Sequence, residues 1–164
     1  MSDSASERSG LRPVVFPYRL YGGVLCPFVE LGLKGVGGEW IKAEAYADSG
    51  AFISIFTEKV AALLGLRLSA GELTHAGGVG GVQIPVYIHR LPVQIGPHKF
   101  SARIGFSDKL GVGFNLLGRI DFFPRFDFIF SDVSQRLILQ PVKGKKIPGG
   151  KGILTLRKIL RKRK

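Results

Sequence analysis

The chain has 164 residues, of which 45% are apolar, and this size suits one compact domain with a real core and terminal tails. The 23 glycines and 9 prolines divide it into many short segments, which predicts a β-rich protein with tight turns. No run approaches the roughly 18–20 apolar residues of a spanning helix, the opening MSDSASERSG lacks the apolar region of a secretory signal, and the lone Cys26 excludes an intrachain disulfide. We therefore expect a soluble, cytoplasmic protein.

The net charge of +12 is concentrated in a C-terminal tail. Residues 142–164 contain ten Lys and Arg and no acidic residue, which leaves 14 basic and 12 acidic residues before them. The apolar residues of the tail fit a short amphipathic helix with a basic face. One interpretation is a solvated tail, and the other is a segment that binds nucleic acid or an anionic membrane surface.

The chain order predicts a tail, a domain and a second tail. Residues 1–12 are small, polar and charged, and we expect them to be disordered. The domain is predicted to cover 13–141. It begins with a β-prone stretch over 14–21, followed by strands over 26–33 and 39–47. Three glycines separate these two strands, as a hairpin turn requires: Gly35, Gly37 and Gly38.

The middle of the chain predicts one helix and a glycine-rich hairpin tip. Thr57 is a candidate N-cap, Gly65 a candidate stop, and Val60, Leu63 and Leu64 are expected to share one face of the helix between them. Residues 74–81 hold four glycines in five positions, which is typical of a mobile hairpin tip. Strands are expected over 82–90, 91–96 and 99–106, then a link over 110–114.

The last part of the predicted domain combines a helical piece with a strand pair. Asn115-Leu116-Leu117-Gly118-Arg119 is expected to lead into a short helix through Phe123, which ends at Pro124. Strands follow over 126–130 and 136–140, and the polar residues 131–134 form the turn between them.

Asp48 is the strongest candidate for chemistry. It follows a predicted strand and precedes Ser49 and Gly50, so its carboxylate lies on a turn that a ligand can approach closely. An ordinary surface turn would have the same three residues. However, the flank that follows, Ala51-Phe-Ile-Ser-Ile-Phe56, is unusually apolar for a solvent turn.

The ordered set of motifs resembles the retropepsin family of aspartic peptidases over about residues 25–140. The family pattern is Asp-Thr/Ser-Gly-Ala, a hydroxyl residue three places later, a glycine-rich flap, and two aliphatic residues with Gly-Arg before a short helix. Here the corresponding residues are Asp48 to Ala51, Ser54, the glycine-rich segment 77–81, and Leu116 to Arg119. The resemblance implies a closed, barrel-like, mostly β fold with one or two short helices, and a homodimer.

The implied activity is hydrolysis of peptide bonds without a metal or cofactor. Two neighbouring carboxylates cannot both ionise, so they share one proton, and one activates water while the other protonates the carbonyl. The chain holds a single Asp-Ser-Gly, so a two-fold dimer must bring Asp48 to its own mate. The resemblance implies an extended peptide as substrate, bound as an added strand.

The resemblance also assigns roles to other residues. Ser49 would brace the pair of aspartates, Gly50 and Ala51 would border the substrate channel, and Arg119 would be a structural cation near the dimer contact. Leu116 and Leu117 would pack beneath the Asp48 turn. The flap tip that closes over the peptide would be Gly77, Gly78, Val79, Gly80 and Gly81.

The sequence also departs from the family pattern. Phe52 stands where many viral members carry an acidic residue that contacts the arginine, which leaves the role of Arg119 open. The termini are longer than in viral enzymes, whose terminal strands build much of the dimer interface. A non-catalytic dimerisation or peptide-binding module with the same fold is therefore the alternative function.

Other chemistries find little support in the residues. The spacing of His75, His89 and His98 matches no compact zinc pattern, so no metal site is predicted. The glycine-rich segment lacks the Gly-Lys-Ser/Thr ending and following helix of a phosphate-binding loop. Cys26 has no evident partner base, so packing is its expected role.

Overall fold

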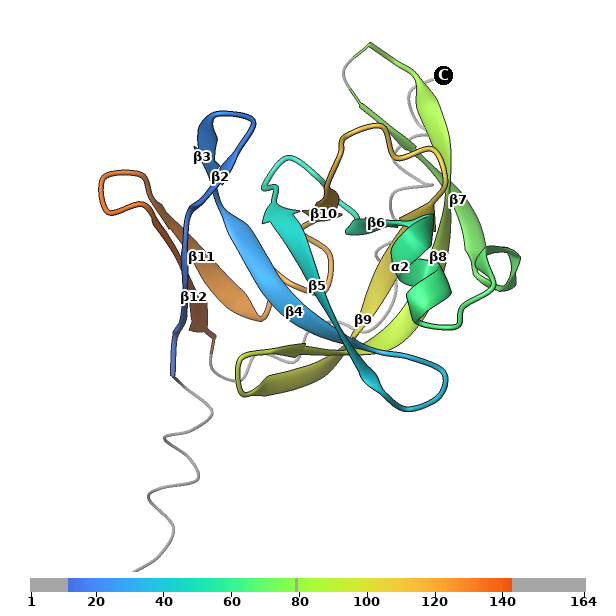
Figure 1. Cartoon of the computed structure of the whole chain (residues 1–164), viewed down its shortest axis with the longest axis horizontal. Coiled ribbons are helices and arrows are strands. Elements are labelled where there is room, and N and C mark those ends of the chain that lie inside the picture. Colours follow the sequence, from blue (N-terminus) through green and yellow to red (C-terminus); the bar gives the residue numbers. More distant parts are fainter. Residues whose placement is uncertain (1–11, 79, 143–164) are drawn as a thin grey trace, which may run out of the picture.

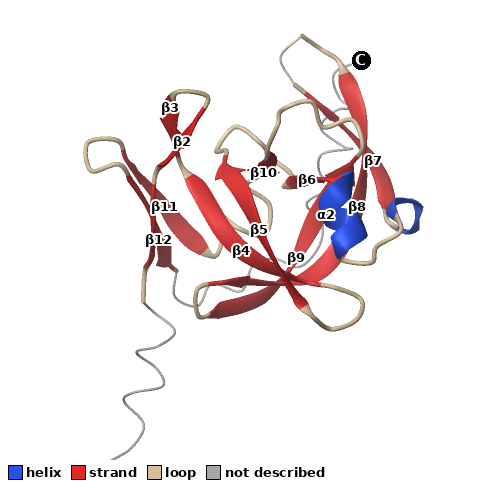
Figure 2. Ribbon diagram, viewed as in Figure 1, coloured by secondary structure: helices blue, strands red, loops and turns tan. Residues whose placement is uncertain are grey.

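The computed structural model describes residues 12–78 and 80–142. Within these residues the protein is mostly β, as predicted, with one short α-helix and one 3₁₀ turn (Figures 1 and 2). No helix in these two ranges has the length and hydrophobicity needed to cross a membrane. The predicted tail helix and most of the first tail lie outside the described residues.

Seven strands form the main sheet, in the order β4-β5-β10-β6-β9-β8-β7. A further pairing of β4 with β8 at Leu33↔Val93 brings the sheet back on itself. The bounds of its strands are β4 Phe28–Lys34, β5 Trp40–Ala47, β6 Ile55–Thr57, β7 Glu72–Gly77, β8 Gln83–Ile95, β9 His98–Ser107 and β10 Asn115–Leu117.

Two smaller sheets complete the fold. A three-stranded sheet has the order β1-β12-β11, with bounds Val14–Pro17, Arg136–Pro141 and Phe126–Ser131. A hairpin of β2 Arg19–Tyr21 and β3 Val24–Cys26 stands apart from both larger sheets. Its turn is Gly22-Gly23, and both residues have positive φ (57° and 82°), which a two-residue turn between twisted strands requires.

The core joins the main sheet to the three-stranded sheet, because one buried cluster contains side chains from both. Strand β5 alternates as predicted: its odd positions from Ile41 to Ala47 pack inward, and its even positions face outward. The large, fully buried side chains come from many different parts of the chain and include Leu33, Phe56, Leu64, Ile95, Ile104, Phe106, Leu117, Phe122, Leu137 and Leu139. This core fixes the end of β5, where the Asp48 turn begins.

Helix α2, Glu58–Leu63, confirms the predicted position but not the predicted face. Its buried stripe consists of Val60, Ala61 and Leu64, whereas Leu63 is 64% exposed. Thr57 occupies the N-cap position without a side-chain capping bond. Gly65 follows the helix with φ +70°, as expected of a helix stop. The 3₁₀ turn η1, Leu68–Ala70, connects α2 to β7.

Two sequence predictions about the strands are corrected. The separate strands expected over 82–90 and 91–96 are the single strand β8, which pairs with β7 in its first half and with β4 near its end. The residues 74–77, expected in a hairpin tip, belong instead to strand β7. The change of partner along β8 explains why its sequence pattern breaks midway.

The helix predicted after Arg119 is wrong, because residues 119–125 form a series of turns. Asp121 adopts a left-handed conformation with φ +68°, which a continuing right-handed helix does not allow. Its carboxylate accepts two side-chain bonds from Arg103 on β9, at 2.8 and 3.0 Å, and one from the Arg103 backbone N–H at 2.9 Å. Both side chains are largely buried. This buried ion pair anchors the segment to β9.

Candidate active site

Asp48 follows β5 directly and lies on a tight, hydrogen-bonded turn. Its Oδ1 accepts a bond from the Gly50 backbone N–H at 2.8 Å, and its carbonyl accepts one from Ala51 at 3.2 Å. Its own N–H donates to the carbonyl of Leu117 at 3.0 Å. No residue in the described ranges donates a hydrogen bond to Oδ2. The turn therefore fixes one oxygen of a half-buried carboxylate and leaves the other available.

Strand β10 lies between the strands that precede and follow the Asp48 turn and pairs with both. It runs parallel to β5, with Leu116 opposite Tyr46, and antiparallel to β6, with Leu116 opposite Ile55. The Asn115 side chain links these flanking strands, because it donates to the carbonyl of Glu44 at 2.7 Å and accepts from Thr57 N–H at 3.0 Å. The strand before Asp48 and the strand after it are thus held by one short segment.

Gly118 and Ser54 complete this brace. The Gly118 N–H donates to the fully buried Ser54 hydroxyl at 2.9 Å. A Cβ at Gly118 would lie 2.5 Å from the Ile53 carbonyl carbon, so any side chain would push the two loops apart. Two separate parts of the sequence motif, the hydroxyl residue Ser54 and Gly118 of the Leu-Leu-Gly-Arg segment, are therefore in direct contact.

Arg119 joins the Asp48 turn to the second sheet. Its N–H donates to the Ala51 carbonyl at 2.9 Å, and its guanidinium Nη1 lies 3.4 Å from the Ser49 carbonyl oxygen. The guanidinium also lies over the Phe123 ring, 4.9 Å from its centroid. Phe123 stacks on Phe128 of β11 with a centroid separation of 4.0 Å. A backbone carbonyl and an aromatic ring thus take the place of the missing carboxylate.

Phe52 contributes its backbone to the same loop and presents its side chain to solvent. Its carbonyl accepts a bond from Ile120 N–H at 2.9 Å, while its side chain is 61% exposed. Ser49 is also exposed.

The glycine-rich segment forms the tip of the β7–β8 hairpin. Gly77 is the last residue of β7 and pairs with Gln83. Gly81 N–H donates to the Gly78 carbonyl at 3.2 Å, and Gly80 and Gly81 have φ values of +96° and +79°. Val79 lies outside the described residues. The tip of this hairpin and the 48–54 loop lie toward the same end of the molecule (Figure 1).

An aromatic cluster beside Asp48 is a feature that the sequence did not predict. Tyr46 stacks on Phe114 at 5.3 Å, and Phe28 and Tyr21 both lie edge-on to Phe114 at 5.9 and 5.2 Å. Burial raises the pKa of Tyr46, and the nearby Asp48 carboxylate raises it further. The Gly22-Gly23 pair between two apolar dipeptides was the signal in the sequence for the hairpin that carries Tyr21.

The cluster borders a pocket of about 330 Å³ between β2, β4, β5 and the 111–114 link. Its lining consists of Arg19, Leu20, Tyr21, Phe28, Glu44, Gly113, Phe114 and Asn115. Arg19 forms an ion pair with Glu44, which connects the β2–β3 hairpin to β5.

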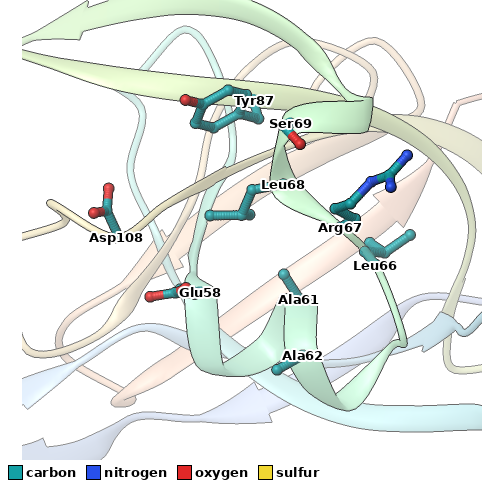
Figure 3. Close-up of a pocket in the computed structure, with 9 residues that line it drawn as sticks. All are labelled: Glu58, Ala61, Ala62, Leu66, Arg67, Leu68, Ser69, Tyr87 and Asp108. Atoms are coloured by element: carbon teal, nitrogen blue, oxygen red, sulfur yellow. The ribbon is translucent and has the colours of Figure 1, made fainter.

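A larger pocket, about 410 Å³, lies elsewhere, between α2, η1 and β8 (Figure 3). Its polar lining comes from Glu58, Arg67, Ser69, Tyr87 and Asp108, and Asp108 forms an ion pair with Lys109 at 2.9 Å. No residue of the Asp48 turn lines it. Residues 12–78 and 80–142 contain no group of three or more His, Cys, Asp or Glu placed to hold a metal ion.

The sheet order and the braced aspartate turn define a class of fold that comparison with solved structures identifies. A retropepsin-like aspartic protease from Rickettsia conorii is 21% identical, with a TM-score of 0.59 over 79% of this chain and 99% of that one. The retroviral protease-like domain of Ddi1 from Leishmania major is 17% identical, with a TM-score of 0.51 over 76% and 99%. No family model and no curated protein matches the chain.

The protein therefore has a retropepsin-like fold, which confirms the resemblance derived from the sequence. At these identities the likeness concerns the fold alone.

Proposed function

We propose that the protein is an aspartic endopeptidase, in which Asp48 and the Asp48 of a second copy activate a water between them. The observation that carries the proposal is the Asp48 turn. There the Gly50 N–H fixes Oδ1, while Oδ2 remains available to a water or a second carboxylate. A turn formed only for stability would not need a braced strand on each side of an available carboxylate.

The proposed chemistry follows from sharing one proton between two carboxylates. The ionised Asp48 removes a proton from the water, the water attacks the peptide carbonyl carbon, and the protonated Asp48 gives its proton to the carbonyl oxygen. Breakdown of the tetrahedral intermediate then transfers a proton to the leaving nitrogen. Gly50 and Ala51 would border the peptide, and Ser49 would support the turn of the second copy.

The β7–β8 hairpin is the proposed flap over an extended peptide. The positive φ values of Gly80 and Gly81 let its tip turn tightly, and Gly78 and Gly80 leave open space where side chains would stand. Closure of such a tip would exclude water from the peptide.

The homodimer, like a fully closed barrel, belongs to this proposal. The free edge of β11 is our candidate for its interface. The edge strand β1 is four residues long and contains Pro17, whereas β11 is six residues long and has no proline. Long, apolar edge strands pair readily with another chain, and two antiparallel copies of one strand satisfy two-fold symmetry. Ile129 and Phe130 are 48% and 41% exposed on β11. Phe128, Phe123 and Arg119 connect this edge to the Asp48 turn.

The test compares the wild type, Asp48→Asn and Asp108→Asn on a diverse peptide library from acid to neutral pH, with products read by mass spectrometry. Asp108 is the matched control, because it is an exposed carboxylate in the larger pocket. We expect cleavage by the wild type and Asp108→Asn and none by Asp48→Asn. Equal cleavage by Asp48→Asn would remove Asp48 from its role, and loss only in Asp108→Asn would move the site to the larger pocket.

The alternative is a non-catalytic dimerisation or peptide-binding module. The exposed Phe52 supports it, because an apolar side chain stands where the family pattern has an acid. Peptide binding without cleavage, unchanged by Asp48→Asn, is the result that would favour this function.

A further inference from the structure

We propose that the outer face of the main sheet around Trp40 binds single-stranded nucleic acid, with an unpaired base stacked on the indole ring and phosphates bound to Lys34 and Lys99. This site is independent of the proposed peptidase function. Trp40 is the first residue of β5 and Asp48 follows the last, so at about 3.3 Å per residue they lie about 26 Å apart along the strand. Figure 1 shows the β4–β5 loop and the 48–54 loop at opposite ends of β5.

A glycine lets the Trp40 ring lie across the neighbouring strand. Gly32 of β4 lies two residues before Lys34, which pairs with Trp40, so Gly32 and Trp40 are on the same face of the sheet. A Cβ at Gly32 would lie 3.2 Å from Cε3 of Trp40 and 3.6 Å from Cβ of Gln94. The indole ring therefore fills the space that a side chain would take. It is supported by the sheet and still 37% exposed, so part of it is open to a ligand.

Two lysines from different strands bring their ammonium groups to this ring. Lys34 Nζ lies 5.9 Å and Lys99 Nζ 5.5 Å from the Trp40 ring centroid. Lys99 of β9 reaches the ring because its partner Gln94 on β8 pairs in turn with Gly32. Neither lysine forms an ion pair with a carboxylate in residues 12–78 and 80–142. A cation–π contact at an exposed site is weak, so both charges remain available to an anionic ligand.

The charge balance of this face is positive. Lys42, the next outward residue of β5, is paired with Glu30 at 3.4 Å, so this pair adds no net charge. The Glu39 carboxylate is turned into the β4–β5 loop, where a Cβ at Gly35 would meet it. The two lysines at the ring therefore determine the sign of the charge that a ligand meets there.

The combination of a ring and two available cations favours one class of ligand. Every nucleic-acid base has a flat face that can stack on an aromatic side chain, and proteins that bind single strands place such rings beside positive charges. A base stacked on Trp40 would bring its own phosphates next to Lys34 and Lys99. A duplex stacks its bases on one another, so it would offer only phosphates to this face.

The fluorescence of Trp40 tests the site directly, because Trp40 is the only tryptophan in the chain. The full chain is titrated with an oligothymidylate of about twelve nucleotides, a length within the range of single-strand sites. Base stacking should quench the fluorescence. Inorganic polyphosphate carries the charges without the bases, so it should bind the lysines without comparable quenching. The duplex of the same oligonucleotide should also leave the fluorescence unquenched.

Substitutions separate the ring from the charges, with binding measured by the anisotropy of a labelled oligothymidylate. Trp40→Leu should weaken binding by about 5-fold or more, whereas Trp40→Phe keeps a ring and should retain most of it. Lys99→Gln should weaken binding and reduce the slope of log K against log salt by about 0.7. Lys59→Gln is the matched control, because it removes one exposed lysine from α2. Urea unfolding checks that each variant is folded under the conditions of the assay.

The possible results either support the proposal or overturn it. Quenching by oligothymidylate alone, with weaker binding in Trp40→Leu and Lys99→Gln and unchanged binding in Lys59→Gln, would support it. Binding without quenching, equal in Trp40→Leu and the wild type, would overturn it and assign the binding to residues 142–164. A fluorescence change with anionic phospholipid vesicles but not with oligothymidylate would overturn it in favour of a membrane surface. No response to either would leave the contacts of Trp40 a purely structural role.

Discussion

The contact between Gly118 and the Ile53 backbone provides the sharpest test of how Asp48 is positioned. In Gly118→Ala the new Cβ would lie 2.5, 2.6 and 2.9 Å from the Ile53 carbonyl carbon, oxygen and nitrogen. These atoms belong to the backbone, so relief requires movement of the loop after Asp48 rather than rotation of a side chain. The same movement would lengthen the 2.9 Å bond from Gly118 N–H to Ser54.

The expected cost combines two terms. Overpacking of a well-packed site costs about 1–3 kcal/mol, and loss of the buried bond to Ser54 adds about 1 kcal/mol. We therefore expect Gly118→Ala to lower the free energy of unfolding by about 2–4 kcal/mol. A displacement of about 1 Å at a catalytic group can cost about 100-fold in rate, so kcat/KM should fall by a similar factor in the folded variant.

Urea unfolding measures the stability, and peptide cleavage measured well below the unfolding midpoint measures the rate. Gly111→Ala is the matched control, because it lies in the preceding link and a Cβ there would have nothing within 4 Å. The two variants add the same methyl group to the same kind of residue. Equal stability and equal activity in both would refute the claim that close contact between the two loops holds the Asp48 turn.

Two further predictions concern the ion pair at the 119–125 turns and the free edge of β11. Burial alone would raise the pKa of Asp121, but its bonds from Arg103 outweigh this and lower the pKa below the ordinary value of 3.8. A lowered pKa gives stability that is present above pH 4 and is lost as the pH falls through the folded pKa. Asp121→Asn keeps a residue that tolerates positive φ and should cost about 3 kcal/mol at pH 7. Urea unfolding should show that the difference in free energy of unfolding between the wild type and Asp121→Asn narrows below about pH 4. A difference that does not change with pH would contradict a role for the Asp121 charge. Ile129→Lys should raise the dimer dissociation constant by about 10-fold or more, because a lysine on an edge strand opposes pairing. Sedimentation equilibrium measures this dissociation constant, with Val133→Lys as the control because Val133 is fully exposed at the hairpin turn. Equal dissociation constants in the two variants would exclude the β11 edge as the dimer interface.

The sequence predicted those features that depend on local pattern. Strand β5 was readable because Trp40, Lys42, Glu44 and Tyr46 alternate with small apolar residues, and its end at Asp48 follows from the turn residues. The hairpin β11–β12 was readable from the polar turn residues 131–134 between two apolar stretches. The position of Leu116 and Leu117 beside the Asp48 turn came from the family resemblance, since no local rule places β10 between β5 and β6.

The features that the sequence did not predict depend on distant partners. The turns at 119–125 replace a helix because Arg103, eighteen residues before Asp121, binds the Asp121 carboxylate. The aromatic cluster assembles Tyr21, Phe28, Tyr46 and Phe114 from four separate segments. Helical or strand periodicity gives no information about such contacts, because it depends only on residues within one element.

The groups that position Asp48 are separate from the exposed side chain of Phe52. Positioning rests mainly on backbone groups: the N–H of Gly50, the carbonyl of Leu117 and the contact at Gly118. The Phe52 side chain takes no part in that task, because it is exposed to solvent and only its backbone carbonyl accepts a hydrogen bond in this loop. This separation explains how Phe52 can replace an acid while the Asp48 turn stays braced.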